Sequence, residues 1–170
     1  WIGGGADKLS RAIILANANW AEAAFGHVWS GGTGNNYLVL DPASGTDPAG
    51  NLVTTQYNDF PNMRWLGYVR SVTPVFDSAH AGSWYCIEAH MKLNDAGAAN
   101  GLFELWINGQ LEARRTNLNW GGSYDAYGIN AVFLENYWGA GSPTTQERYF
   151  DNFVVSTKPI GPVGGANTPP

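Results

Sequence analysis

The sequence predicts an all-β fold, a two-sheet antiparallel sandwich of the jelly-roll type. Short alternating or apolar segments recur along the 170 residues, separated by stretches rich in Gly, Pro, Asn and Asp. No amphipathic helix longer than about ten residues is visible, so the alternating strand and helix pattern of α/β proteins is absent. The connections between the segments are long, which favours a jelly roll over a simple meander.

The first third of the chain contains three expected strands and one ambiguous segment. Residues 11–15 (RAIIL) are a short apolar run that begins a strand. Residues 20–30 are ambiguous, because their alanines favour a helix whereas a glycine and the aromatic residues favour a strand or loop. Residues 37–40 (YLVL) and 52–57 (LVTTQY) are expected strands. Residues 41–51 between them form a loop dense in Asp, Pro and Gly.

The middle of the chain continues the same pattern. Residues 64–69 (RWLGYV) are a candidate strand. Residues 72–76 are an expected edge strand, because Pro74 cannot donate a ladder hydrogen bond. Residues 84–94 and 102–108 form an expected antiparallel hairpin around a loop of Gly, Asn, Asp and Ala.

The last strands complete one domain. Residues 110–119 continue the sheet of the hairpin, residues 129–137 (INAVFLENY) form a strand, and residues 149–156 (YFDNFVVS) form the final one. We therefore expect a single sandwich domain over residues 1–158. Residues 159–170 (PIGPVGGANTPP) are a Pro/Gly-rich tail or linker.

Composition excludes several classes of protein. A hydrophobic content of 44% is too high for a disordered chain. The net charge of −5 and the scattered basic residues argue against nucleic acid as a partner. No apolar stretch is long enough for a membrane span. Only 14% of residues are charged, so the surface suits neutral polar ligands or self-association.

The ends and the single cysteine bear on location. Cys86 is the only cysteine, so no intrachain disulfide forms. Trp1 is not an initiator methionine and no signal peptide follows it. We expect the mature domain of a secreted, extracellular protein, or a fragment of something longer with neighbouring modules.

The hairpin carries the strongest functional signal. Side chains alternate across a strand, so its odd-numbered positions form an apolar face and its even-numbered positions form a polar one. Acids, a histidine, a lysine and a tryptophan on one face are typical of a sheet that binds or cleaves sugars. The shortest register with matching parity pairs His90 with Glu104, Glu88 with Trp106, and Lys92 with Leu102.

Three interpretations of this polar face remain open. It is a solvated face whose charges pair with one another, a binding face on which Trp106 stacks against sugar rings, or a catalytic face. Glu88 and Glu104 would lie about 7–8 Å apart, which suits glycoside hydrolysis in principle. A hydrogen bond from His90 to Glu104 would instead raise the basicity of the imidazole for β-elimination on a uronic acid.

The hairpin and the C-terminal segment resemble concanavalin A-like jelly rolls. The pattern is Trp84 and Glu88, then Lys-Leu-Asn at 92–94, Asn-Gly at 100–101 and a strand ending in Trp-Ile-Asn-Gly at 106–109. The segment FDNFVVSTKPIG at 150–161 resembles the last strand of the same group. The group includes laminin-G-like and polysaccharide lyase-like domains, so the resemblance implies this fold and a polysaccharide or glycan partner.

The resemblance also limits the chemistry. The Glu-x-Asp-x-x-Glu strand of the retaining β-glucanases is absent, as are the Gln-Ile-His and Tyr-x-Lys motifs of the alginate lyases of this fold. If the chain is an enzyme, a polysaccharide lyase is the expected type, with His90 as the base. The group that neutralises the substrate carboxylate could be Arg114, Arg115 or Asn130. The acid could be Tyr124, Tyr127 or Tyr137.

Members of this fold often hold a structural Ca²⁺ between an acid of the last strand and oxygens near the N-terminus. The resemblance would place that acid at Asp151, with residues 3–7 nearby. The alternative is that Asp151 only turns or caps the strand end. The three histidines, His27, His80 and His90, lack the spacing of zinc ligands.

Three hypotheses follow. The leading one is a secreted carbohydrate-binding or carbohydrate-active jelly roll that presents its aromatic and acidic strand face to a polysaccharide. The second is a lyase that uses His90 and a tyrosine for β-elimination. The third is a non-catalytic structural subunit of an extracellular assembly, favoured by the low charge content and the Pro-rich end.

Overall fold

The predicted two-sheet antiparallel β-sandwich is confirmed. This computed structural model describes residues 8–18, 20–30, 36–137, 145 and 147–162, and in them the chain forms nine strands and one short 3₁₀ turn, η1. The elements are β1 Lys8–Ala18, β2 Ala21–Ser30, β3 Tyr37–Ser44, η1 Phe60–Asn62, β4 Arg64–Trp65, β5 Val69–Pro74, β6 Ile87–Lys92, β7 Gly101–Ile107, β8 Gln110–Leu118 and β9 Ala131–Tyr137.

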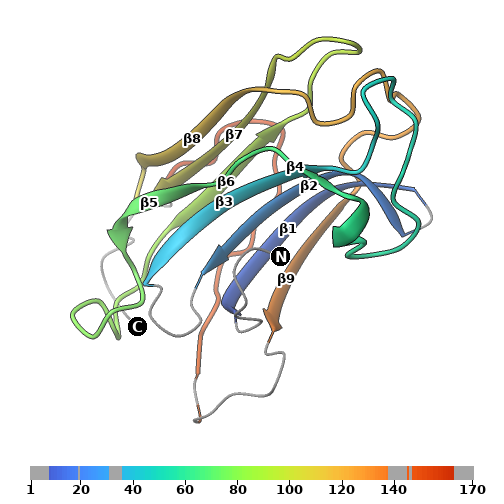
Figure 1. Cartoon of the computed structure of the whole chain (residues 1–170). Helices are drawn as coiled ribbons and strands as arrows, with labels where there is room; N and C mark the ends of the chain where they lie inside the picture. Colours follow the sequence, from blue (N-terminus) through green and yellow to red (C-terminus); the bar gives the residue numbers. More distant parts are fainter. Residues whose placement is uncertain (1–7, 19, 31–35, 138–144, 146, 163–170) are drawn as a thin grey trace.

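Two antiparallel sheets pack face to face (Figure 1). The large sheet has the order β4-β3-β2-β1-β9, and β5 pairs with β3 beside β4. The small sheet has the order β6-β7-β8. The fold is thus an all-β sandwich, consistent with a concanavalin A-like jelly roll. No helix in the described part of the chain is long and apolar enough to cross a membrane.

The main core lies between the two sheets. Val28, Leu38 and Leu40 of the large sheet face Phe103 and Leu105 of the small sheet, and all five are at most 4% exposed. They alternate with outward-facing residues, as period two requires. This alternation fixes which side of each sheet faces away from the core.

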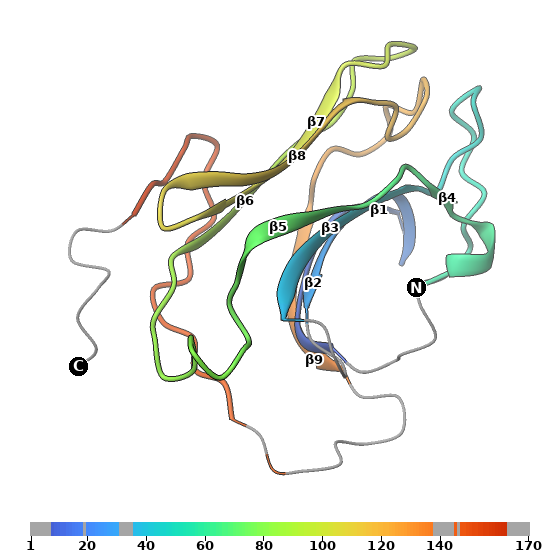
Figure 2. The same cartoon turned by 60° about the vertical axis from the view of Figure 1, so that its left-hand side comes forward.

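The large sheet carries a second apolar cluster on its other side. Figure 2 shows that this sheet curves, with its concave side turned away from β6-β7-β8 and towards η1. Phe25, Ala43 and Met63 are buried there, and Phe60 and Trp65 pack against them. Because β2 and β3 are buried on both faces, their sequence lacks a clean polar–apolar alternation, which explains the ambiguity of residues 20–30.

The hairpin register is confirmed at every predicted pair. His90 is opposite Glu104, Glu88 opposite Trp106, and Lys92 opposite Leu102. The next turn, from β7 to β8, consists of Asn108 and Gly109, both at positive φ (51° and 78°). An Asn-Gly pair at positive φ matches the right-handed twist of a hairpin, so it fixes the pairing of β7 with β8.

The predicted strand at 52–57 is wrong, and the loop at 41–51 begins late. The candidate strand at 64–69 is interrupted, because β4 ends at Trp65 and β5 begins at Val69. Residues 41–44 extend β3, and residues 52–57 contribute only an isolated bridge between Leu52 and Thr46. In place of a ladder, the side chain of Thr54 donates to the carbonyl of Glu22, and the carboxylate of Asp59 accepts the amide of Thr55. Such side chain–backbone bonds compete directly with strand pairing.

The expected strand at 149–156 pairs with no strand in the described part of the chain. Asn152 adopts a left-handed φ of 53°, and its amide donates to the Asp151 carboxylate at 2.7 Å. This local bond breaks the extended backbone that a ladder needs. Further along, Ile160 and Gly161 donate their amides to Glu88 at the start of β6. The division at residue 158 therefore stays a prediction.

Candidate functional site

The predicted polar face exists and lies on the outward side of the small sheet. Its centre is a cluster of His90, Glu104 and Arg114, which we call the outward-face cluster. The Glu104 carboxylate is 2.8 Å from Nδ1 of His90 and accepts Nε of Arg114 at 2.6 Å. Its side chain is 7% exposed, whereas those of His90 and Arg114 are 51% and 49% exposed. The expected hydrogen bond between His90 and Glu104 is therefore present.

Glu104 stays ionised in this cluster. Burial on its own would raise the pKa of the carboxyl, but the hydrogen bonds from His90 and Arg114 outweigh it and lower that pKa. An ionised carboxylate only accepts hydrogen bonds, so Nδ1 of His90 carries the proton and Nε2 points away from Glu104. This geometry is compatible with a base or a ligand-binding site. It is equally compatible with a solvated face on which the charges of the cluster pair with one another.

The other predicted residues of this face are less concentrated. Glu88 is occupied, because its two carboxylate oxygens accept the amides of Ile160 and Gly161 at 3.0 Å each. The segment that carries these amides is drawn in red beside the small sheet in Figure 2. Trp106 is half-buried and Lys92 is exposed. The two carboxylates of the hydrolase hypothesis thus have different environments.

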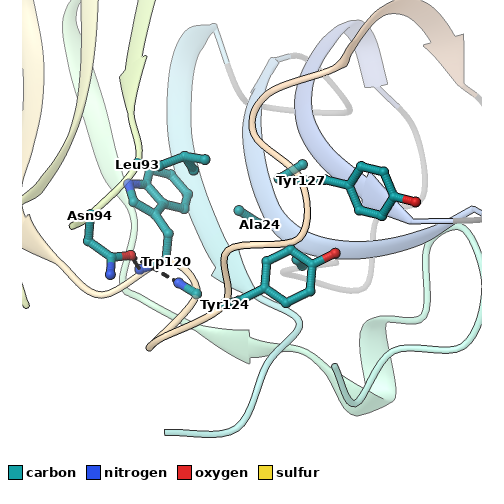
Figure 3. A pocket seen from close by; sticks show the side chains of 9 residues that line it. Ala24, Leu93, Asn94, Trp120, Tyr124 and Tyr127 are labelled. Carbon is teal, nitrogen blue, oxygen red and sulfur yellow. Dashed lines mark hydrogen bonds between the residues drawn. The ribbon is translucent and has the colours of Figure 1, made fainter. Parts of the chain in front are cut away.

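Tyr124 lies elsewhere, at one end of the sandwich. It lines a pocket with Tyr127, Trp120, Asn94 and Ala24 (Figure 3). The cavity volume is about 30 Å³. That is room for about two water molecules. A sugar ring does not fit, so this pocket does not unite Tyr124 with the outward-face cluster.

The remaining predicted site residues are dispersed. Asn130 is exposed just before β9, and Tyr137 ends β9 with its side chain outside the described residues. Asp151 is exposed. Among the described residues no group of three His, Cys, Asp or Glu could hold a metal ion. Residues 3–7, the other half of the calcium hypothesis, lie outside the described ranges, so that site stays a prediction.

The concave side of the large sheet holds polar residues that the sequence did not single out. Leu38 and Leu40 face the core, so Tyr37 and Asp41 face the other way. His27 is directly opposite Asp41, and both are at most 1% exposed. The indole Nε1 of Trp29 donates to the Asp41 carboxylate at 3.2 Å. His27 and Asp41 are thus cross-strand neighbours, and Asp41 also accepts a hydrogen bond from Trp29.

Arg70 adds a cation to this side. It is opposite Val39 in the pairing of β5 with β3, and its guanidinium carbon lies 4.3 Å from the centre of the Tyr37 ring. The side chain is exposed and forms no ion pair with any described residue. Arg114, by contrast, forms an ion pair with Glu104. Arg70 is therefore available for an anionic ligand.

The opposite end of the concave side contains two further acids. Glu135 accepts the phenol of Tyr57 at 2.5 Å. Glu22 is fully buried, and its Oε1 accepts the amide of Asn58 at 2.9 Å. Its Oε2 has no hydrogen-bond partner among the described residues. Burial raises the pKa of Glu22 to about 7, and the charge of Asp59 adds to this rise while the amide of Asn58 opposes it.

Glu22→Gln is expected to flatten the pH dependence of stability. Because the native pKa of Glu22 is about 7 against an ordinary 4.5, the native state binds the proton more tightly than the unfolded chain. Stability is then greatest below the ordinary pKa and falls as pH rises through the native one. At about 1.4 kcal/mol per pKa unit, the wild type should lose roughly 2–3 kcal/mol that the variant keeps.

The measurement is denaturant unfolding of both proteins at about pH 5 and about pH 8. Glutamine retains the oxygen that accepts the Asn58 amide, so the fold is preserved. Equal losses of stability in wild type and variant would contradict the assignment of the titration to Glu22.

A sequence signal for the concave side exists but is weak. His27 and Trp29 alternate within residues 20–30, as Tyr37 and Asp41 do within residues 37–41. Polar side chains at same-parity positions of otherwise apolar strands indicate a second face with its own chemistry. The signal is weak because the composition of residues 20–30 does not distinguish a strand from a helix, and Asp41 begins a segment rich in Asp, Pro and Gly.

Comparison with known proteins adds one finding. The family described as Polysaccharide lyase 14 matches residues 30–153, well over half of the chain. The matched region includes Tyr37 and Arg70 on the concave side and the whole outward-face cluster. No curated protein and no solved structure matches the chain significantly.

Proposed function

The chain belongs to the polysaccharide lyase 14 family, and from this premise we propose that it cleaves an acidic polysaccharide by β-elimination on the concave side of its large sheet. The family supports a carbohydrate-active function with a polysaccharide partner. The choice of reaction, of substrate charge and of face is our proposal. Arg70 is the observation that carries it.

Arg70 favours the concave side over the outward face. Uronate polysaccharides carry one carboxylate per sugar, and a guanidinium binds a carboxylate through two parallel hydrogen bonds. Arg70 is exposed and makes no ion pair in the described structure, whereas Arg114 already binds Glu104. A substrate carboxylate would have to displace Glu104 to reach Arg114, but it meets no such competitor at Arg70.

The chemistry requires a cation, a base and an acid. A base removes the proton on the carbon next to the substrate carboxylate, which turns that carboxylate into an enolate-like anion. The C–O bond to the leaving sugar then breaks, a C=C bond forms, and the leaving oxygen takes a proton. Arg70 stabilises the charge that develops on the carboxylate. Tyr37, whose ring lies against Arg70, is the proposed proton carrier.

A second function has its own support. On the outward face, His90 and Glu104 form the expected hydrogen bond, and Trp106 is half-buried on the same side of the sheet. This arrangement favours polysaccharide binding, or elimination with His90 as the base. The outward side of a three-stranded sheet is open to water, however, and elimination gains from a concave surface that excludes it. We also propose that the domain acts outside the cell, where such polymers occur.

The decisive experiment incubates the protein with a panel of uronate polysaccharides and with neutral polysaccharides as controls. β-Elimination creates a conjugated double bond, so we expect ultraviolet absorbance to rise with one or more uronates and with no neutral polymer. Affinity electrophoresis on the same panel measures binding. Retention without any absorbance change would replace the lyase with a binding module, and the absence of both would favour the structural-subunit hypothesis.

A further inference from the structure

Three aromatic side chains gather at the β9 edge of the concave side. Trp20, in the turn from β1 to β2, stacks on Phe133 of β9 with ring centres 6.4 Å apart and planes 17° apart. Tyr57 meets both rings edge-on, at 6.3 Å from Trp20 and 5.8 Å from Phe133. Trp20 is 62% exposed. We call these three residues the aromatic platform.

The backbone conformation of Trp20 is strained. Its φ is 70°, in the left-handed region that costs a residue other than glycine about 1–2 kcal/mol. Ala18 and Ala21 are paired, so the turn that contains Trp20 is tight. A large side chain that is strained and exposed contributes little to the core, and strain of this kind concentrates at functional sites.

The charges around the platform select the ligand. Tyr57 donates its hydroxyl to Glu135, and Glu22 lies buried near the loop that carries Tyr57. The uncharged face of a pyranose ring fits these neighbours, because its C–H groups pack on an aromatic ring and its hydroxyls can donate to the Glu135 carboxylate.

The strand register runs from Arg70 to Glu135, the residue of β9 that Tyr57 of the platform contacts. Arg70 is opposite Val39, Val39 opposite Trp29, Trp29 opposite Arg11, and Arg11 opposite Glu135. This row crosses five strands at right angles to them. Its ends are four strand spacings apart, or about 19 Å. Phe133 lies two residues along β9 from Glu135 and on the same face of the sheet. A polysaccharide that crosses the strands from the guanidinium therefore reaches the aromatic platform beside the far end of the row.

We propose that Trp20, Phe133 and Tyr57 form a sugar-stacking subsite that binds one pyranose ring of the polysaccharide by its uncharged face, about four strands away from Arg70. The subsite rests on the proposed function for the identity of the polymer. It adds the direction of the polymer, across the strands, and a distance from the carboxylate-binding end. Short oligosaccharides that reach only Arg70 therefore lack this contact.

The test compares Trp20→Ala with Phe153→Ala, a variant of an aromatic residue that is 61% exposed and lies outside the platform. Affinity electrophoresis and KM are measured on a long uronate polymer, and thermal unfolding on each variant. Trp20→Ala should weaken binding and raise KM about tenfold with little change in kcat. Phe153→Ala should match wild type. Unchanged binding by a folded Trp20→Ala would overturn the subsite.

Two conservative variants guard against loss of folding. Trp20→Phe keeps a stacking ring and should bind within about threefold of wild type. Tyr57→Phe keeps the ring but loses the hydroxyl to Glu135, and it should also retain most of the binding. If Trp20→Phe binds as weakly as a variant without the ring, stacking is not the cause and the proposal fails.

The outcomes separate the subsite from the proposed function. A wild type that binds but does not cleave, and whose binding weakens in Trp20→Ala, would sink the lyase while supporting the subsite. A wild type that cleaves with the same KM as Trp20→Ala would support the lyase and overturn the subsite.

Discussion

Arg70→Ala is expected to lower kcat/KM on an acidic polysaccharide by about 10³-fold, with most of the loss in kcat. The guanidinium is positioned to stabilise charge that appears only when the proton next to the carboxylate has left. Removing one such stabilising donor from an enzyme typically costs about 10²–10³ in rate. Stability should change by less than about 0.5 kcal/mol, because Arg70 is exposed and its described contact is with the Tyr37 ring.

Arg114→Ala is the matched control. It removes the same side chain from the opposite sheet, where Glu104 already neutralises it. Rates measured from the ultraviolet absorbance of the product should stay near wild type in Arg114→Ala. Arg70→Lys should retain part of the activity, since lysine keeps the charge and loses the planar fork. The reverse ranking, with Arg114→Ala inactive and Arg70→Ala active, would move the site to the outward face and to His90.

The hairpin shows what the sequence was able to predict. The parity of the polar and apolar positions limits the possible registers of β6 and β7. The shortest of these registers places the polar residues of both strands on one face. A one-residue slip would turn Phe103 and Leu105 outwards, so the remaining registers differ by two residues. The shortest loop then selects the register that pairs His90 with Glu104. The side-chain hydrogen bond between His90 and Glu104 then followed from their distance.

The concave side shows what the sequence was unable to predict. A strand that is covered on both faces has no clean alternation of polar and apolar residues. From the sequence alone, His27 therefore lies in an ambiguous segment and Asp41 in an expected loop. Sequence patterns do not single out Arg70, for a different reason. Its role depends on which strand lies beside β5, and the pairing of β5 with β3 is a long-range contact that periodicity does not encode.

The two predicted strands that the structure does not form were prevented by local hydrogen bonds. Residues 52–57 and 149–156 have strand-like composition, but Asp59, Asp151 and neighbouring polar side chains bind backbone amides within their own loops. Such bonds depend on side-chain geometry and are not visible in hydrophobic periodicity. The apolar residues at 149–155 are consequently exposed, among them Phe150 at 53% and Val155 at 68%.

The position of the small sheet depends on Trp120. This residue is fully buried in the main core, and its ring meets Phe103 edge-on at 5.5 Å. Its indole donates to the carbonyl of Lys92 at 2.9 Å, and its amide donates to the side chain of Asn94 at 2.8 Å. It also fills the space beside Gly101, where an added Cβ would lie 2.4 Å from the ring. Trp120 therefore ties β8 to both strands of the hairpin.

Trp120→Ala is expected to destabilise the protein by about 4 kcal/mol, measured by denaturant unfolding at neutral pH. The variant loses the buried ring, leaves a cavity beside Phe103, and removes the donor to the carbonyl of Lys92. Trp106→Ala is the control, because Trp106 is half-buried on the outward face of the same hairpin and should cost about 1 kcal/mol. Trp120→Phe keeps a ring but loses the hydrogen bond, so its cost should lie between the two. A loss below about 1 kcal/mol in Trp120→Ala would mean that the hairpin holds its position without Trp120, and the packing that aligns the two sheets would have to come from Phe103 and Leu105 instead.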